Sequence, residues 1–301
     1  MRNLIGLLFF RGKIMPEVKP FKSIEEQIKI LEERGLIIDD KDEAIKTLRH
    51  INYYRLSGYT LTLRNKDIFY KNITFGDMMQ LYYFDVELRG LLLEMLDVVE
   101  VSFRTHIAYY HSAQYGALGY RQNKGFENLD YHKEFIQDLE KTIQSDKKTN
   151  EVFIKHYNEK YDGQFPIWVV VEMLTFGTIS MLYSNSDYEI KKRISKEIYG
   201  VPPEYIQNWL RGLVIIRNIC AHRGRLYNRP IVIKPKLSNK DKQYGIRNDR
   251  IFSYIFVLKK LIVDPNMWDT FMSSLERIIV KYPFVKLEAL GFVLNWKEVL
   301  K

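Results

Sequence analysis

Cysteine and long apolar runs are the two features that this sequence most clearly lacks. Cys220 is the single cysteine among 301 residues, which excludes an intrachain disulfide and disfavours a cysteine-based metal site. No segment reaches the roughly 18 consecutive apolar residues that a membrane-spanning helix needs. We therefore expect a cytoplasmic protein in a reducing compartment, with no membrane association, no metal and no other cofactor.

The sequence also has little of what a secretion signal requires. Residues 4–10 form an apolar run after Arg2, but the run is short and no small-residue cleavage site follows it. The segment from Met15 to Pro20 has the character of a natural beginning. We expect residues 1–14 to be a loose tail or an over-extended start.

Positive charge is concentrated in one window. Between Arg211 and Arg250 the chain has eleven Lys and Arg residues and two Asp residues, so this window carries the whole net charge of +9. A basic stretch beside aromatic residues favours a nucleic-acid partner over a solvated loop with a chance surplus of lysine.

Helical periodicity accounts for most of the chain, so we predict an all-α fold with one large helical core. Capping signals and apolar stripes at three- and four-residue steps mark the predicted helices. They span about 24–34, 40–54, 74–116, 131–143, 151–161, 187–199, 203–219, 248–263 and 265–281. A further helix starts near 165, where three valines also suit a strand but the preceding proline favours a helix.

These elements divide the chain into five parts. We predict an N-terminal tail (1–20), an N-terminal helical region (21–73), a helical core (74–229), a basic loop (230–250) and C-terminal helices (251–301).

The basic window begins where an apolar helix turns polar, at Arg217, Asn218 and His222. Asn218 and His222 are four residues apart and lie about 40° apart on a helix, so they share a face. Arg217 lies about 140° from His222, so we expect an irregular helix near Gly224 or an arginine that reaches across it. Taken singly, these residues are typical of a helix end, where cations complement the helix dipole.

Together the three side chains supply the groups for metal-free cleavage of RNA. Histidine transfers protons because its ordinary pKa lies near neutrality, and arginine neutralises phosphate oxygens in two-point contact. Asparagine donates to a phosphate or orients the histidine. The 2′-hydroxyl attacks the adjacent phosphate in this route, which selects RNA over DNA. One histidine is an incomplete acid–base set, so we expect a homodimer with two such stretches at its axis, or a second set within the chain.

A second polar stripe lies on the long helix predicted over 74–116. Glu100, Arg104 and His111 recur at steps of four and seven residues and so lie on one face. Glu100 and Arg104 form either an ordinary surface ion pair or part of a stripe that faces the functional cavity.

These stretches together resemble the Abi-like abortive-infection proteins of the AbiD/AbiF type. Arg217, Asn218 and His222 match the R-N-x(3)-H form of the motif of HEPN-domain ribonucleases. The similarity extends from about residue 20 to 230. It is also carried by residues 51–59, 103–109, 166–168 with 176–178, and 220–229.

The resemblance implies a HEPN-like helical bundle with extra N- and C-terminal helices, metal-independent endoribonuclease activity, and a role in phage defence or a toxin–antitoxin pair. It also makes Arg217, Asn218 and His222 the catalytic positions, in an active site that HEPN nucleases usually form across a dimer. Some relatives are associated with a structured small RNA, so a regulatory or antitoxin RNA is an expected partner. HEPN antitoxins that pair with nucleotidyltransferases carry a tyrosine two residues after the histidine. Gly224 at that position argues against modification by such a partner.

Two alternatives stay open at this point. Arg104 and His111 also fit the spacing of a second motif, although Glu100 and Arg104 more simply support the first site. The chain is either a nuclease or a non-catalytic protein that holds a structured small RNA; a purely structural protein is the third option. In either RNA case we expect RNA contacts from Arg211, Arg223, Arg225, Asn228, Arg229, Lys234, Lys236, Lys240 and Lys242.

Overall fold

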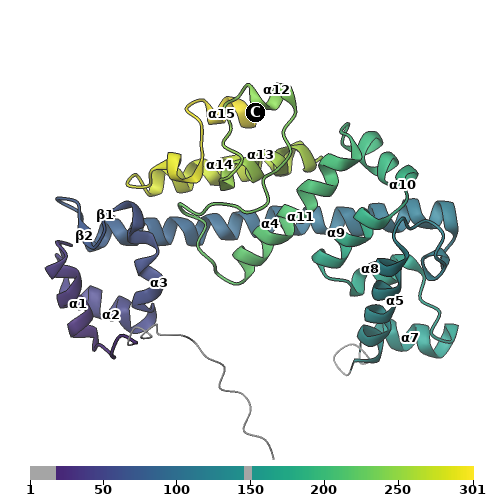
Figure 1. Cartoon of the computed structure of the whole chain (residues 1–301), viewed down its shortest axis with the longest axis horizontal. Helices are drawn as coiled ribbons and strands as arrows, with labels where there is room; N and C mark the ends of the chain where they lie inside the picture. Colours follow the sequence, from purple (N-terminus) through teal and green to yellow (C-terminus); the bar gives the residue numbers. More distant parts are fainter. Residues whose placement is uncertain (1–17, 146–150) are drawn as a thin grey trace, which may run out of the picture.

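The architecture is built around one long helix. The computed structural model describes residues 18–145 and 151–301, so the expectations for residues 1–14 lie outside the described part of the chain. Helix α4 (Phe75–Tyr115) runs along most of the molecule (Figure 1). Its 41 residues make it about 60 Å long. The predicted all-α fold is confirmed, because the other described elements are helices apart from one small hairpin.

The ends of α4 lie where the sequence predicts them. Thr74 and Asp77 form a reciprocal capping box at the start, and Gly116 ends the helix with a φ of 77° that favours glycine. Its buried residues are mostly large and apolar, among them Leu81, Phe84 and Leu88. This long apolar surface gives the chain one continuous core. It packs against the later helices α8 (Ile167–Met173), α9 (Phe176–Asn185), α11 (Pro203–Ala221), α13 (Ile251–Leu261) and α14 (Pro265–Lys281).

The N-terminal helices gather at one end of α4 (Figure 1). They are α1 (Ile24–Glu33), α2 (Lys41–His50) and α3 (Tyr53–Ser57), followed by a 3-10 turn (Tyr59–Thr62) and the hairpin β1 (Arg64–Asn65) and β2 (Ile68–Phe69). The single helix predicted over 40–54 is wrong. It is divided after His50, because Ile51 is extended and the Asn52 side chain accepts the N–H of Tyr54 to start α3.

A second group of helices lies at the other end of α4 (Figure 1). They are α5 (Leu129–Gln144), α7 (Val152–Tyr161), α8 (Ile167–Met173), α9 (Phe176–Asn185) and α10 (Tyr188–Lys192), which continues as a π-helical turn (Arg193–Ile198). The choice of helix over strand after Pro166 is confirmed, since Val169–Val171 lie within α8. That helix is shorter than its apolar run suggests, because Thr175 caps a new helix, α9.

Helix α11 (Pro203–Ala221) packs against the middle of α4 and leads into the basic segment. The loop predicted over 230–250 is irregular up to Ser238, where a capping box opens the one-turn helix α12 (Asn239–Lys242). Helices α13 (Ile251–Leu261), α14 (Pro265–Lys281) and α15 (Trp296–Leu300) follow and lie above α4 in Figure 1. None of the helices in the two described segments is long and apolar enough to cross a membrane.

Candidate functional site at the end of helix α11

The predicted catalytic residues lie on the last turn of α11 and just beyond it. His222 is the capping residue, and its backbone N–H donates to the carbonyl of Asn218 over 2.9 Å. The N–H of Arg223 donates to Cys220, and that of Gly224 donates to Ile219 over 2.7 Å. These paired bonds close the helix end and leave His222 and Asn218 exposed. The helix is regular up to Ala221, so the irregularity expected near Gly224 lies in the cap, not within the helix.

Arg217 reaches away from α11 toward α4. Its guanidinium group lies 3.6 Å from a carboxylate oxygen of Glu100 and donates to the side-chain oxygen of Asn218 over 3.3 Å. Glu100 is buried, whereas the Arg217 side chain is 37% exposed. The link between the end of α11 and the polar stripe of α4 is therefore a direct ion pair.

Arg104 fixes Glu100 from the other side. Its guanidinium group donates to Glu100 and to the carbonyls of Val171 and Leu174 at the end of α8. The last carbonyls of a helix are poorly paired, and the Val171 carbonyl otherwise accepts only the N–H of Leu174 over 3.4 Å, so the arginine completes their hydrogen bonding. Glu100 thus lies between two arginines, and its orientation is set before any ligand arrives.

His111 does not join this cluster. It is 1% exposed and packs against the rings of Tyr115 and Phe126. Neither of its ring nitrogens has a hydrogen-bond partner among the described residues. Burial lowers the pKa of His111 to about 4, so the ring is neutral near pH 7. The structure therefore separates Arg104, which contacts Glu100, from His111, two turns further along α4.

A buried carboxylate holds the loop that follows the site. Asp85 on α4 is fully buried and pairs with Arg89 one turn later. It accepts the hydroxyl of Tyr59 over 2.8 Å and the backbone N–H groups of Leu226 and Tyr227, the latter over 2.7 Å. Burial raises the pKa of the Asp85 carboxyl, and the pairing with Arg89 opposes that rise.

Asp85 and Arg89 are residues that sequence reasoning missed. The available signal was an i,i+4 pair of opposite charge on the apolar face of α4, between Leu81 and Leu92. A charged pair on a face that is otherwise core is expected to bind backbone groups or another charge. Here it fixes the course of the loop from Gly224 to Tyr227, because Arg89 also donates to the Gly224 carbonyl over 3.3 Å.

The predicted RNA-binding residues fall into two separate groups. Arg223, Arg225, Asn228 and Arg229 lie on the loop that leaves the site, where Arg229 donates to the Arg225 carbonyl. The other residues lie elsewhere along α11 and beyond it. Arg211 borders a hollow beside α5 and α9.

The lysines lie near the start of α11. Asn208 bonds to the backbone of Lys234 and Lys236, and Lys240 and Lys242 follow in α12. Asn208 is fourteen residues before His222, or about 20 Å along a helix. The basic window of the sequence is thus not a single patch in the fold.

Cys220 offers no thiolate for chemistry at this site. Cys220 is buried, and burial raises the pKa of its thiol to about 12, so it is not a thiolate near pH 7. Across residues 18–145 and 151–301, no three histidine, cysteine or acidic side chains are grouped to hold a metal ion.

The comparisons with known proteins give one match. A family model described as Abi-like protein matches residues 46–228, which is more than half of the chain. The match includes α4, the end of α11 and the loop fixed by Asp85. Neither the comparison with curated proteins nor that with solved structures gives a match.

Proposed function

The chain belongs to the family of Abi-like proteins, and from that premise we propose that it is a metal-independent endoribonuclease of the HEPN type. Membership of this family suggests a role in abortive-infection phage defence. The proposed activity goes further, to RNA cleavage through attack of the 2′-hydroxyl, either in phage defence or as the toxin of a toxin–antitoxin pair.

The observation that carries the proposal is the gathering of Arg217, Asn218 and His222 at one exposed helix end. Arg217 is oriented by Glu100 and still partly open to solvent, so its guanidinium group can contact a phosphate oxygen. His222 is exposed at the cap of the same helix and can transfer a proton. In the proposed step the 2′-oxygen bonds to phosphorus, its proton passes to a base, and the 5′-oxygen leaves after taking a proton. Arg217 stabilises the charge on the phosphoryl oxygens.

The proton transfers require a donor and an acceptor, and one chain offers one histidine in this cluster. No side-chain hydrogen bond orients the His222 ring among the described residues, unlike the fixed Glu100. We propose that a homodimer brings two α11 ends together and supplies the second histidine. The open ring also favours the second candidate function, a non-catalytic protein that holds a structured RNA.

The test is RNA cleavage by the purified chain in the presence of EDTA. We expect the wild-type protein to cleave and His222→Ala to lose about 10²–10⁴-fold in rate, because a general acid–base is removed. His156→Ala is the matched control, since His156 is an exposed histidine on α7. Equal cleavage by wild type and His222→Ala would exclude the proposal. Tight RNA binding by both, with no cleavage, would support the second candidate.

Control by a bound RNA is the remaining part of the proposal. Arg223, Arg225 and Arg229 have no carboxylate partner within the described residues, so this loop carries an unneutralised positive charge. Sequencing the RNA that copurifies with His222→Ala tests this point. One dominant structured species would support control by RNA, and a random mixture of fragments would argue against it.

A further inference from the structure

A groove lies beside the proposed active site, between the N-terminal helices and α4. It holds about 1210 Å³ of open space. Arg55 of α3 forms one side, Arg89 and Gly90 of α4 form the floor, and the α11 end forms the other side through Cys220, Ala221 and Arg223. Two of these α11 residues flank His222 in the chain, so the groove leads to the proposed site.

The groove has positive charge and no lining carboxylate. Arg89 is neutralised by the buried Asp85 beneath it, but Arg55 and Arg223 are exposed and form no ion pair among the described residues. The Arg55 guanidinium group donates to the Arg223 carbonyl over 2.6 Å, which brings the two arginines together from positions 168 residues apart. The contact joins the Arg55 side chain to the Arg223 backbone, so two exposed arginines without a carboxylate partner border one groove and would both attract an anion bound there.

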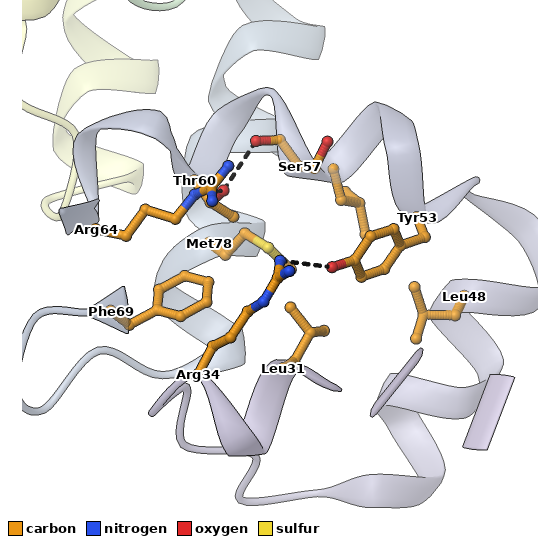
Figure 2. A pocket seen from close by; sticks show the side chains of 10 residues that line it. Leu31, Arg34, Leu48, Tyr53, Ser57, Thr60, Arg64, Phe69 and Met78 are labelled. Atoms are coloured by element: carbon orange, nitrogen blue, oxygen red, sulfur yellow. Dashed lines mark hydrogen bonds between the residues drawn. The ribbon is translucent and has the colours of Figure 1, made fainter. Parts of the chain in front are cut away.

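A second arginine-lined cavity in the same region differs from the groove, because its arginines have a carboxylate partner. It lies among the N-terminal helices, where the guanidinium group of Arg34 points toward the hydroxyl of Tyr53 (Figure 2). Arg34 and Arg64 border this cavity, and both approach Asp67, at 3.8 Å and 2.9 Å. These two arginines thus share one carboxylate, whereas Arg55 and Arg223 have none among the described residues.

Arg223 also has an unusual backbone. Its φ of 55° is left-handed, a conformation that costs free energy for any residue except glycine. It occupies the position after the helix cap where glycine is most common, and a glycine follows directly at 224. A strained backbone at an exposed arginine beside the proposed site favours a role for its side chain that offsets the cost.

Gly90 contributes no side chain to the groove, although Tyr82, Val86 and Leu93 of α4 line it too. Gly90 lies in the middle of α4, where glycine weakens a helix relative to alanine. A Cβ atom at this position would meet no other atom within 4 Å, so packing does not require the glycine. The exposed backbone at Gly90, in a groove bordered by two exposed arginines, leaves room for an extended polyanion.

We propose that this groove binds the phosphodiester backbone of single-stranded RNA and guides the strand to His222. Arg55 and Arg223 hold successive phosphates, and Gly90 gives the strand room to lie against α4. A strand outside a duplex can align its 2′-hydroxyl with the adjacent phosphate, which an A-form helix disfavours. This inference rests on the proposed function for the fate of the RNA, but the binding itself is independent of cleavage.

The experiment measures RNA affinity in the His222→Ala background, so that cleavage does not interfere. A fluorescein-labelled single-stranded RNA is titrated with the full chain, and anisotropy is followed at several salt concentrations. We expect Gly90→Glu, Arg55→Ala and Arg223→Gly each to weaken binding by about tenfold, with the salt slope reduced by about 0.7 for each lost phosphate contact. Gly90→Glu and Arg223→Gly remove helix-weakening or strained residues, so their melting temperatures should not fall.

Two matched controls keep charge changes separate from groove effects. Gly76→Glu introduces the same charge on α4 at an exposed position with room for a side chain, and Arg277→Ala removes an exposed arginine from α14. Helix α14 lies on the opposite side of α4 from α3 in Figure 1. Both controls should bind within about twofold of the parent protein, as expected for exposed sites away from a ligand.

The outcomes separate this inference from the proposed function. Unchanged RNA affinity in all three groove variants would overturn the proposal that the groove binds RNA, even if the wild-type chain cleaves RNA. Weakened binding in those variants would support it, even if the wild-type chain proves inactive. Single-stranded DNA of the same sequence should show the same losses, and losses confined to RNA would overturn the assignment of Arg55 and Arg223 to phosphates.

Discussion

Two arginine–histidine pairs have similar spacings in this chain, and the fold gives them opposite environments. Arg217 and His222 lie at the end of α11, where the arginine side chain is 37% exposed. Arg104 and His111 lie within α4, where the arginine side chain is 11% exposed and the histidine 1%. A helix end leaves side chains free for a ligand, whereas a central helix buries them against its neighbours. Spacing alone therefore does not distinguish a proposed active site from a packing contact.

Removal of Arg104 is expected to have the largest effect, and the effect is on stability. Arg104→Ala leaves the Leu174 carbonyl without a donor and the Val171 carbonyl with only the long 3.4 Å bond from the Leu174 N–H. It also leaves buried Glu100 with only the longer contact to Arg217. We expect the free energy of unfolding to fall by about 3 kcal/mol. Urea denaturation measures it. Arg277→Ala, which removes an exposed arginine, should change it by less than about 0.5 kcal/mol. A loss of that small size for Arg104→Ala would contradict its structural role.

Removal of Arg217 should have the opposite effects, a small loss of stability and a large loss of RNA cleavage. Arg217→Ala deletes a partly exposed ion pair, so the free energy of unfolding should change by at most about 1 kcal/mol. RNA cleavage should fall about 10²–10³-fold, because charge developing on the phosphate loses its stabilising group. Single-turnover cleavage in EDTA is the measurement. If Arg217→Ala unfolds like Arg104→Ala and its residual folded fraction cleaves normally, the distinction between the two arginines is wrong.

The buried histidine predicts a dependence of stability on pH. The pKa of His111 is about 4 in the fold, below the 6.5 of an exposed histidine. As the pH falls, His111 therefore takes up a proton in the unfolded chain before it does so in the folded chain. The free energy of unfolding that this residue contributes above pH 6.5 is lost as the pH approaches 4. From this residue we expect the free energy of unfolding to be about 2 kcal/mol lower at pH 5 than at pH 8. Burial also lowers the pKa of His106, which adds in the same direction.

The variant that tests this prediction is His111→Leu, which removes the titrating group and keeps an apolar side chain among Tyr115 and Phe126. Its unfolding free energy should depend less on pH between 8 and 5 than that of the wild type. His156→Ala should retain the wild-type dependence, since that histidine is exposed. Identical pH profiles for His111→Leu and the wild type would show that His111 is not the source.

The sequence predicts the elements that local chemistry determines. Thr74 with Asp77 and Ser23 with Glu26 mark helix starts, and both capping boxes are present. The sequence does not predict the end of α2 at His50, because the helical periodicity continues past this point. The N–H of Tyr54 donates to the Asn52 side chain there, and this local bond competes with the helix. The hairpin of β1 and β2 has only two residues in each strand, too few for an alternating pattern.

In the candidate site, the sequence likewise fails to predict contacts between residues that are far apart in the chain. Helical spacing suggested that Glu100 and Arg104 support Arg217, and the ion pairs place these three together. Spacing could not show that Asp85 fixes residues 226 and 227, because these residues are more than 140 positions apart. It also could not separate the arginines of the site loop from Lys234 and Lys236, which follow them in sequence but pack beside Asn208. Tertiary packing decides these points.

The smallest expected effect concerns Asn218, which has no counterpart beside Arg104. Its side-chain oxygen accepts from Arg217, so its amide nitrogen is free to donate to a phosphate. We expect Asn218→Asp to slow cleavage about tenfold, because it removes that donor and places a negative charge beside the phosphate. Asn218→Ala should slow cleavage about threefold, since it removes the donor without adding a charge. Single-turnover rates at saturating RNA compare the two. Faster cleavage by Asn218→Asp than by Asn218→Ala would show instead that the residue acts through its oxygen, by orienting Arg217.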